Sequence, residues 1–180
     1  MNDQGKKILI AMVLMGTFVL FYLYFSIIKK QGPGVESMVK IGEKAPDFEL
    51  AVLGGNTVKL SDYKGKVVFL NIWASWCPPC REEMPAMEAL HNRLKDRPFQ
   101  MLAVSIDQGG EKVVGPFTAR WGLTFPVLLD PEGKTYKLYG LTGVPETFIL
   151  DKNGVIIQKI IGQQNWMNAQ WLEYFDRIIG

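Results

Sequence analysis

The stretch that decides the fold of this chain is Trp73-Ala74-Ser75-Trp76-Cys77-Pro78-Pro79-Cys80, which contains both of its cysteines. An apolar run, Val67 to Trp73, comes directly before the motif and is typical of a buried strand. An amphipathic helical pattern begins in the second half of the motif and continues to about Leu94. Pro78 suits the first turn of such a helix, because the N–H that it lacks would have no partner there. The sequence therefore predicts a strand-to-helix turn with Cys77 at the helix N-terminus.

The position of Cys77 favours thiol chemistry. The unpaired N–H groups and the helix dipole stabilise negative charge at a helix N-terminus. Such sites lower the pKa of a cysteine thiol below its usual value of about 8.5. Because the thiolate is the nucleophile in disulfide exchange, we predict that Cys77 attacks and that Cys80, one helical turn further on, resolves the mixed disulfide.

Three other roles for the cysteine pair fit the sequence less well. A structural zinc site needs about four ligands, whereas the chain has two cysteines and one histidine. Covalent haem attachment needs a histidine directly after the second cysteine, and that position is Arg81. A purely structural disulfide across so short a loop would restrain little chain entropy. We therefore predict a redox-active disulfide, Cys77–Cys80, with no other cofactor and no metal.

The N-terminal segment, residues 1–30, predicts a membrane anchor. Residues 8–28 carry no charge and are flanked by lysines on both sides. At about 1.5 Å per residue this run covers roughly 30 Å, the thickness of a bilayer core. No small-residue cleavage site follows it, so we expect a single-pass transmembrane helix that is retained. The flanking lysines do not decide the orientation. A short N-terminal tail most simply stays in the cytoplasm, which would place the rest of the chain outside, on the periplasmic or outer face of the cell membrane.

The remainder of the chain is expected to form a linker at 31–39 and one domain at 40–180. From Glu36 onward there are 16 Lys or Arg and 17 Asp or Glu residues, so this part is nearly neutral. It contains no basic block, and nucleic acid is not expected as a partner. A domain of this length is large enough to bury one sizeable core.

The pattern of strands and helices predicts an α/β fold. Turn residues at 54–56 and 151–154 indicate two hairpins, one before the cysteine motif and one near the C-terminus. The other expected elements are strands at 99–106 and 125–129, a helix at 111–121 interrupted near Gly115-Pro116, and a helix at 167–178. This order predicts a mixed central sheet with helices on both faces and an additional N-terminal β-hairpin.

Three segments resemble the TlpA/ResA/CcmG group of thioredoxin-fold proteins. They are Ala45-Pro46-Asp47-Phe48, Asn71-Ile72-Trp73-Ala74-Ser75-Trp76-Cys77-Pro78-Pro79-Cys80-Arg81-Glu82-Glu83 and Gly143-Val144-Pro145-Glu146-Thr147-Phe148. The resemblance extends over about residues 40–179 and implies a thioredoxin fold. Members of the group are membrane-anchored thiol–disulfide oxidoreductases outside the cytoplasm. Pro145 to Phe148, together with Glu83, is most similar to the reductases of cytochrome c maturation, which open a disulfide so that haem can attach to the apocytochrome.

The resemblance also assigns roles to single residues. Cys77 matches the exposed attacking cysteine of the group and Cys80 its buried partner. Pro145 matches the cis-proline that faces the cysteine pair, and an X–Pro bond adopts the cis form at a cost of only about 0.5–1 kcal/mol. The backbone of Val144 would then pair with an extended substrate strand. Trp76, beside Cys77, is expected to shape the rim that contacts the substrate.

Two acids are candidates for proton handling. Glu83 lies three residues after Cys80 and so on the same helical face, where a buried carboxylate would tune the pKa of the thiol. Thioredoxin carries a buried Asp six residues before its first cysteine, but this chain has Asn71 there, so Glu83 is the natural replacement. Glu83 could instead be an ordinary exposed helix acid. Glu146, beside Pro145, is a candidate substrate contact or else a polar residue at a strand edge.

These observations predict an extracytoplasmic thiol:disulfide reductase acting on protein disulfides, with apocytochrome c or its partner as the expected substrate. Its electrons would come from a membrane thiol donor, because the compartment is oxidising. A general periplasmic disulfide reductase, or an oxidase or isomerase of secreted proteins, stays open. A copper-binding metallochaperone that uses the cysteines and His91 also stays open. A peroxiredoxin is set aside, because Leu70 and Ala74 occupy positions where its motif needs Pro and Thr or Ser.

Overall fold

The computed structural model describes residues 3–30 and 39–180, which belong to two separate units. The first unit contains helix α1 (Asp3–Lys30). The predicted span at 8–28 lies within α1, but no helix among the described residues has the length and apolarity that crossing a membrane requires. The transmembrane prediction is therefore not confirmed. Most of the predicted linker lies outside the described residues. Its last residue, Val39, is buried in the core of the second unit.

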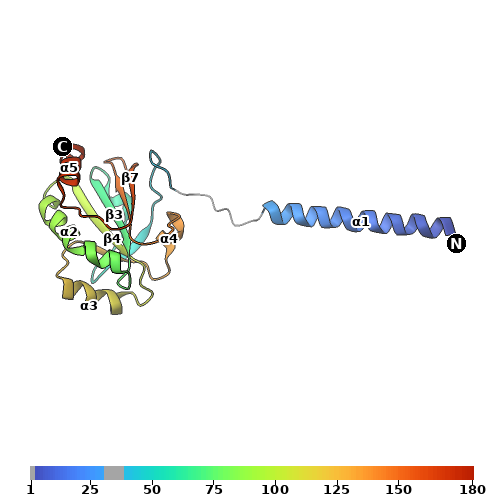
Figure 1. The fold of residues 1–180 in the computed structure, drawn as a ribbon, viewed down its shortest axis with the longest axis horizontal. Coiled ribbons are helices and arrows are strands. Elements are labelled where there is room, and N and C mark those ends of the chain that lie inside the picture. Colours follow the sequence, from blue (N-terminus) through green and yellow to red (C-terminus); the bar gives the residue numbers. More distant parts are fainter. Residues whose placement is uncertain (1–2, 31–38) are drawn as a thin grey trace. The chain divides into compact units, whose positions relative to one another are not determined.

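The second unit is built on a seven-stranded mixed sheet with the order β2-β1-β5-β4-β3-β6-β7 (Figure 1). The strands are β1 (Glu49–Val52), β2 (Thr57–Lys59), β3 (Val67–Trp73), β4 (Phe99–Ser105), β5 (Val127–Leu129), β6 (Glu146–Leu150) and β7 (Ile156–Ile161). β3 is central: it pairs in parallel with β4 and antiparallel with β6. Every residue of β3 is buried, as its uninterrupted apolar run predicts.

Helices cover both faces of this sheet. They are the 3-10 helix η1 (Leu60–Tyr63) and the α-helices α2 (Pro78–Leu94), α3 (Glu111–Trp121), α4 (Lys134–Leu138) and α5 (Ala169–Ile179). Side chains of α2, α3 and α5 share one buried cluster with Phe69 and Trp73 of β3. Leu70 and Ile72 point to the opposite face, where residues from η1 and the end of α4 complete a second cluster. The alternation along β3 therefore gives the sheet two apolar faces and places α2 on one of them.

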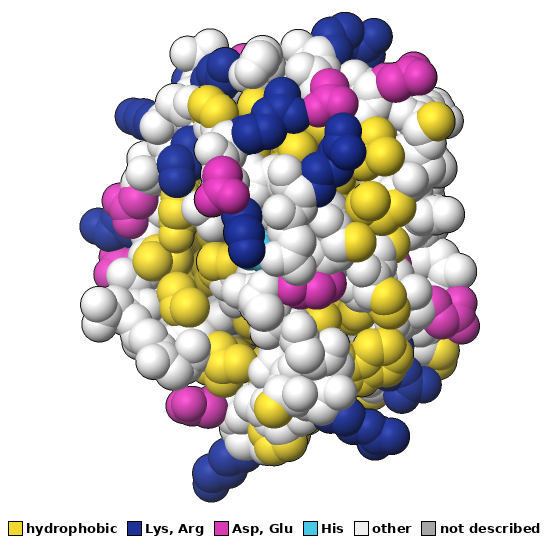
Figure 2. Space-filling model, turned by 90° about the vertical axis from the view of Figure 1, so that its left-hand side faces the viewer, with side chains coloured by type: hydrophobic (Ala, Val, Ile, Leu, Met, Phe, Trp, Pro, Cys, Tyr) yellow, Lys and Arg dark blue, Asp and Glu magenta, His cyan; other side chains and the backbone are white. Residues whose placement is uncertain are grey.

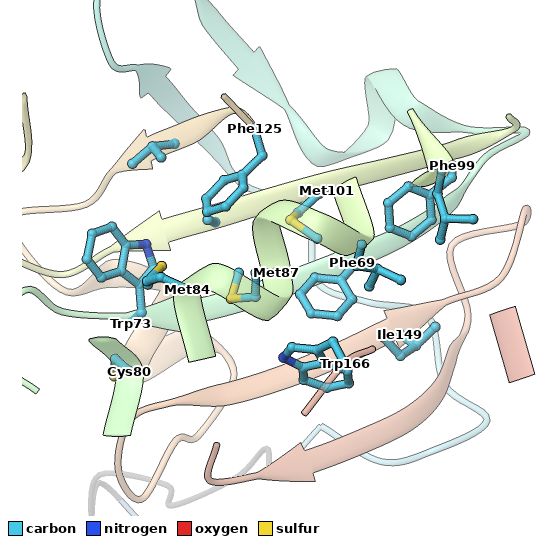
Figure 3. Close-up of a cluster of buried hydrophobic side chains, with 14 of the residues drawn as sticks. Phe69, Trp73, Cys80, Met84, Met87, Phe99, Met101, Phe125, Ile149 and Trp166 are labelled. Atoms are coloured by element: carbon cyan, nitrogen blue, oxygen red, sulfur yellow. The ribbon is translucent and has the colours of Figure 1, made fainter. Parts of the chain in front are cut away.

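The apolar stripe of α2 packs directly on the central strands. Met84 and Met87 extend from this helix toward the sheet, and Cys80 lies at the end of the same row, near Trp73 (Figure 3). Further along, the ring of Trp166 meets that of Phe69 edge-on, with 4.7 Å between ring centroids. The methionines thus serve packing, and the core fixes the face of α2 on which the second cysteine lies.

Both predicted hairpins are confirmed, since β1 pairs with β2 and β6 with β7, each antiparallel. The interruption predicted near Gly115-Pro116 is wrong, because α3 is continuous from Glu111 to Trp121. Pro116 lacks an N–H for the helical ladder and crowds the carbonyl four residues before it, but neither effect ends the helix here. Buried Val114 holds this stretch of α3 on the core, and the hydroxyl of Thr118 donates a hydrogen bond of 2.9 Å to the Gly115 carbonyl.

Candidate active site

The two cysteines form a disulfide at the start of α2, with their Cα atoms 5.3 Å apart. Cys77 is the N-cap residue, and the N–H of Cys80 donates to its Sγ at 3.2 Å. The predicted strand, turn and helix are confirmed. Cys77 is less accessible than its expected role suggested, at 3% exposed, but Cys80 is entirely buried. Cys77 is thus the cysteine that an incoming sulfur reaches first.

A buried carboxylate that the sequence analysis missed holds the loop before Cys77. Asp107 accepts hydrogen bonds from the N–H of Ser75 at 2.9 Å and from its hydroxyl at 2.7 Å. It also accepts one from the Ser105 hydroxyl at 2.8 Å. Asp107 lies two residues after the end of β4, the parallel neighbour of β3, and the carboxyl ends of parallel strands meet at one edge of a sheet. That position was the sequence signal that could have identified it.

Val144 lies against the disulfide and is joined to Pro145 by a cis peptide bond, as predicted. The carbonyl oxygen of Val144 is 3.4 Å from the Sγ of Cys77. Among residues 3–30 and 39–180, the N–H of Val144 has no hydrogen-bond partner. An extended segment lying beside Cys77 could therefore bond to this backbone as an added strand does. The predicted substrate contact at Val144 has the geometry that it needs.

Glu83 is buried at 2% exposure and accepts three hydrogen bonds from two segments that are far apart in the sequence. Asn71 of β3 donates its side-chain amide to Oε1 at 3.0 Å. The indole N–H of Trp166 and the backbone N–H of Gln164 donate to Oε2 at 3.1 and 3.2 Å. The structure thus makes Glu83 a buried acid on the cysteine-bearing helix, as the functional interpretation predicted, and excludes an ordinary exposed helix acid. Trp166 and Gln164 come from the segment between β7 and α5, and no motif in the sequence predicts that this segment lies beside Glu83.

Burial raises the pKa of Glu83 to about 7, although its hydrogen bonds from Gln164, Asn71 and Trp166 act in the opposite direction. A carboxyl that titrates near neutrality can both take and release a proton under physiological conditions. Glu83 also lines a surface pocket of about 310 Å³, together with Gln163 and Gln164. This pocket gives the buried carboxyl a short route to solvent.

Asn71 is the one member of this group with an unused polar atom. Its amide nitrogen donates to Glu83 and also to the Thr147 hydroxyl, at 2.9 Å. Its Oδ1 is buried and accepts no hydrogen bond. A protonated Glu83 would offer an O–H donor, and a half-turn of the Asn71 amide would present Oδ1 to it. Asn71 can therefore partner both protonation states of Glu83.

Glu146 does not lie where a substrate contact was expected. Its side chain is completely buried and lies on the sheet face opposite to Asn71 and Thr147. It accepts hydrogen bonds from the N–H and hydroxyl of Thr142, at 3.0 and 3.2 Å, and its Oε2 lies 3.1 Å from the ammonium of Lys159. The contact with Lys159 is an ion pair, and Oε2 accepts no hydrogen bond from the described residues. The correction is that Glu146 fixes the loop before Pro145 and does not touch the substrate.

Trp76 and His91 occupy very different surroundings. Trp76 is 62% exposed directly beside Cys77, so it is accessible for the predicted contact with the substrate at the rim around Cys77. His91 packs edge-on against Phe125 and is half-buried. It lies 11 residues after Cys80 on α2, or about 16 Å along the axis at about 1.5 Å per residue. Among the described residues no cluster of His, Cys, Asp and Glu is arranged to hold a metal ion.

A disulfide at a strand-to-helix turn, faced by a cis-proline and supported by this mixed sheet, defines the thioredoxin-fold thiol–disulfide oxidoreductases. The chain belongs to the AhpC/TSA family, whose model matches residues 41–159.

Similar proteins agree on this chemistry. The thiol-disulfide oxidoreductase ResA of Bacillus cereus is 36% identical over 174 residues, which cover 96% of this chain and 94% of that protein. The thioredoxin-like protein YneN of Bacillus subtilis is 44% identical over 120 residues, 66% of this chain and 69% of that one. A crystal structure of a thiol:disulfide interchange protein DsbE from Chlorobium tepidum is 37% identical, covers 79% of this chain and 99% of its own, and gives a TM-score of 0.73. This protein is therefore a thiol–disulfide oxidoreductase that acts through Cys77 and Cys80 on protein disulfides.

Proposed function

We propose that this protein is a reductase that works outside the cytoplasm, held to the cell membrane by residues 8–28. Its substrate would be the disulfide of apocytochrome c or of a partner that delivers the apocytochrome for haem attachment. The resemblance to the TlpA/ResA/CcmG group supports this substrate, and the uncharged run at 8–28 supports the anchor.

The chemistry follows two exchange steps. The thiolate of reduced Cys77 attacks one sulfur of the substrate disulfide, forms a mixed disulfide and releases the first substrate thiolate. The thiolate of Cys80 then attacks Cys77, which restores the Cys77–Cys80 disulfide and releases the second substrate thiolate. Two electrons pass from the protein to the substrate. Because the second step needs Cys80 without its proton, a base near this buried thiol accelerates it.

The observation that carries the reducing direction is the buried carboxyl of Glu83, one helical turn beyond Cys80. A dithiol is a strong oxidant when its environment stabilises the reduced, thiolate form. A carboxylate one turn from the thiol does the opposite, because it repels a second negative charge in a site that excludes water. The dithiol form is thereby destabilised, and the protein tends to give its electrons away.

A reductase outside the cytoplasm needs a source of electrons. The surrounding compartment keeps thiols oxidised, so a membrane thiol donor would have to reduce Cys77–Cys80 after each cycle. The donor and the substrate would meet the same exposed rim at Trp76, because Cys80 is closed to solvent.

The reduction potential of the full-length protein in detergent tests the proposal. Equilibration in thiol buffers should give a value near or below about −230 mV, within or below the glutaredoxin range. A value above about −180 mV would make the protein an isomerase or an oxidant instead. The substrate is tested separately: the reduced protein should open the disulfide of apocytochrome c faster than that of an unrelated secreted protein. Equal rates would indicate a general disulfide reductase.

A further inference from the structure

A hollow of about 450 Å³ lies between the start of α2 and one side of α3. Its floor is apolar, formed by Val113, Pro116, Phe117 and Trp121, and its charged residues are Arg81 and Arg120. We call it the arginine hollow. α3 lies at the lower edge of the domain in Figure 1. At the same edge in Figure 2, Lys or Arg side chains project beside hydrophobic surface.

The arginine hollow begins next to the reactive sulfur. The backbone N–H of Arg81 donates to the carbonyl of Cys77 at 3.2 Å, so this arginine is one helical turn from the attacking cysteine. Ser75, two residues before Cys77, lines the hollow on the same side. Ser75 and Val113 also line a neighbouring hollow of about 850 Å³ that contains Trp76. A chain segment that leaves Cys77 past Trp76 can therefore continue into the arginine hollow without a gap.

The two arginines are available to a partner. Both are exposed, and among residues 3–30 and 39–180 every ion pair involves other residues. The lining contains no acidic side chain. The domain as a whole is nearly neutral, so two unpaired guanidinium groups beside one apolar floor are a local feature of this surface. A guanidinium binds a carboxylate through two parallel hydrogen bonds, and this geometry favours acidic partners.

The floor carries exposed aromatic and aliphatic surface. Trp121 is 39% exposed and stacks on Phe117, with 5.7 Å between ring centroids, and Val113 is 43% exposed. Tryptophan and arginine are the residues most enriched where a few side chains supply most of the binding energy of an interface. Phe117 in turn packs on buried Trp73, which holds the floor rigid. The hollow therefore combines a rigid apolar surface with a rim of positive charge.

We propose that the arginine hollow binds the segment of a protein substrate that flanks its disulfide, and that it selects segments carrying an acidic side chain next to an apolar one. The proposal rests on the proposed function in that the occupant is a protein disulfide. It adds a preference in the chemistry of the substrate: acidic flanks are recognised and basic flanks are repelled.

Two matched peptides test this preference. Each carries the same disulfide, flanked by Glu-Phe in one peptide and by Lys-Phe in the other. Reduced full-length protein in detergent is mixed with each, and peptide thiols are counted after acid quenching. We expect kcat/KM to be about tenfold higher for the glutamate peptide, because like charges across an interface are strongly disfavoured. The preference should weaken as ionic strength rises.

Variants assign the preference to the two arginines. The double variant Arg81→Glu/Arg120→Glu should prefer the lysine peptide over the glutamate peptide. The neutral double variant Arg81→Gln/Arg120→Gln should reduce both peptides at similar rates. Lys40→Glu/Lys66→Glu makes the same change in net charge at the end of the sheet where β3 begins, away from the disulfide, and should leave the preference intact. Circular dichroism shows whether each variant is folded, and reduction of the small uncharged substrate 2-hydroxyethyl disulfide by the unaltered protein shows that its thiols are active. Because the preference is the ratio of two rates for one variant, an effect of the substitution on the thiols that is common to both peptides cancels.

The outcomes separate the two proposals. Equal rates for both peptides with the unaltered protein, or an equal shift in the lysine control, would overturn selection by the arginine hollow and leave the reductase function standing. Reduction of 2-hydroxyethyl disulfide but of neither peptide would overturn both. If the peptides show no preference but Arg81→Glu/Arg120→Glu abolishes binding to vesicles of anionic phospholipid, the hollow contacts the membrane surface and the proposal is wrong.

Discussion

Replacement of Glu83 by Gln should change how the stability of the domain depends on pH. The pKa of this carboxyl rises from 4.5 to about 7 on folding. The folded domain therefore keeps a proton that the unfolded chain loses, and stability falls as pH rises from 4.5 to about 7. At about 1.36 kcal/mol for each pKa unit, ionisation of Glu83 lowers the free energy of unfolding by about 3 kcal/mol. Glu83→Gln cannot ionise, so this loss should be absent.

Urea unfolding of the oxidised fragment from Ser37 to Gly180 provides the assay, because this unit has its own core. The free energy of unfolding is measured at pH 4.5, 6 and 8 for the unaltered domain and for the variant, and the difference between the two cancels the other titrating groups. The glutamine amide can keep the bonds from Trp166 and Gln164, and a rotated Asn71 can accept from its NH₂ group.

Between pH 4.5 and pH 8, the free energy of unfolding of the variant should increase by about 3 kcal/mol relative to that of the unaltered domain. Glu82→Gln is the matched control, since it removes the preceding, exposed carboxylate from the same helix. A pH dependence that is the same for Glu83→Gln and the unaltered domain would refute the reasoning. It would mean that Glu83 keeps its ordinary acidity despite its burial. If the proton role at Cys80 is also correct, Glu83→Gln should slow disulfide exchange and remove a titration near pH 7 from its rate profile.

Three further predictions follow from the contacts of the site. Trp166→Phe keeps an aromatic ring in the core but removes the indole N–H that lowers the pKa of Glu83, so the stability step should move to higher pH; an unmoved midpoint would contradict this. Asp107→Ala leaves the donors of Ser75 without an acceptor and should cost about 2–4 kcal/mol in the free energy of unfolding, which urea titration at fixed pH would detect. Trp76→Ala, at an exposed position, should change stability by less than about 0.5 kcal/mol but slow the reduction of protein disulfides more than that of 2-hydroxyethyl disulfide; an equal effect on both substrates would exclude a rim contact.

The fold was largely predictable because its signals are local. The apolar run of β3, the turn residues of both hairpins and the stripe on α2 each depend on residues close together in the sequence. The predicted interruption of α3 was wrong because the prediction considered only the low helix propensity of Gly115-Pro116. The helix is held in place by the packing of Val114 on a core that other segments build.

The active site was predictable only where it is contiguous. Cys77, Cys80 and Glu83 follow from spacing along one helix, and Val144 and Pro145 from the resemblance. Asp107 was missed because its role depends on the parallel pairing of β3 with β4, which brings the ends of both strands to one edge. Glu146 was wrongly predicted to contact the substrate, because a one-residue step along a strand reverses the face of the sheet on which a side chain lies.

The two buried acids near the disulfide, Asp107 and Glu83, have different roles, and their hydrogen-bond donors explain the difference. The donors to Asp107 are the backbone and hydroxyl of Ser75 and the hydroxyl of Ser105, all next to the turn that it holds. These contacts fix a position. Glu83 accepts from Asn71, Gln164 and Trp166, which come from β3 and from the segment before α5. Asn71 can partner either protonation state, and the pocket at Gln164 opens to solvent. A carboxyl in such surroundings can take and release a proton while it keeps hydrogen-bond partners, which is what the resolving step at Cys80 requires.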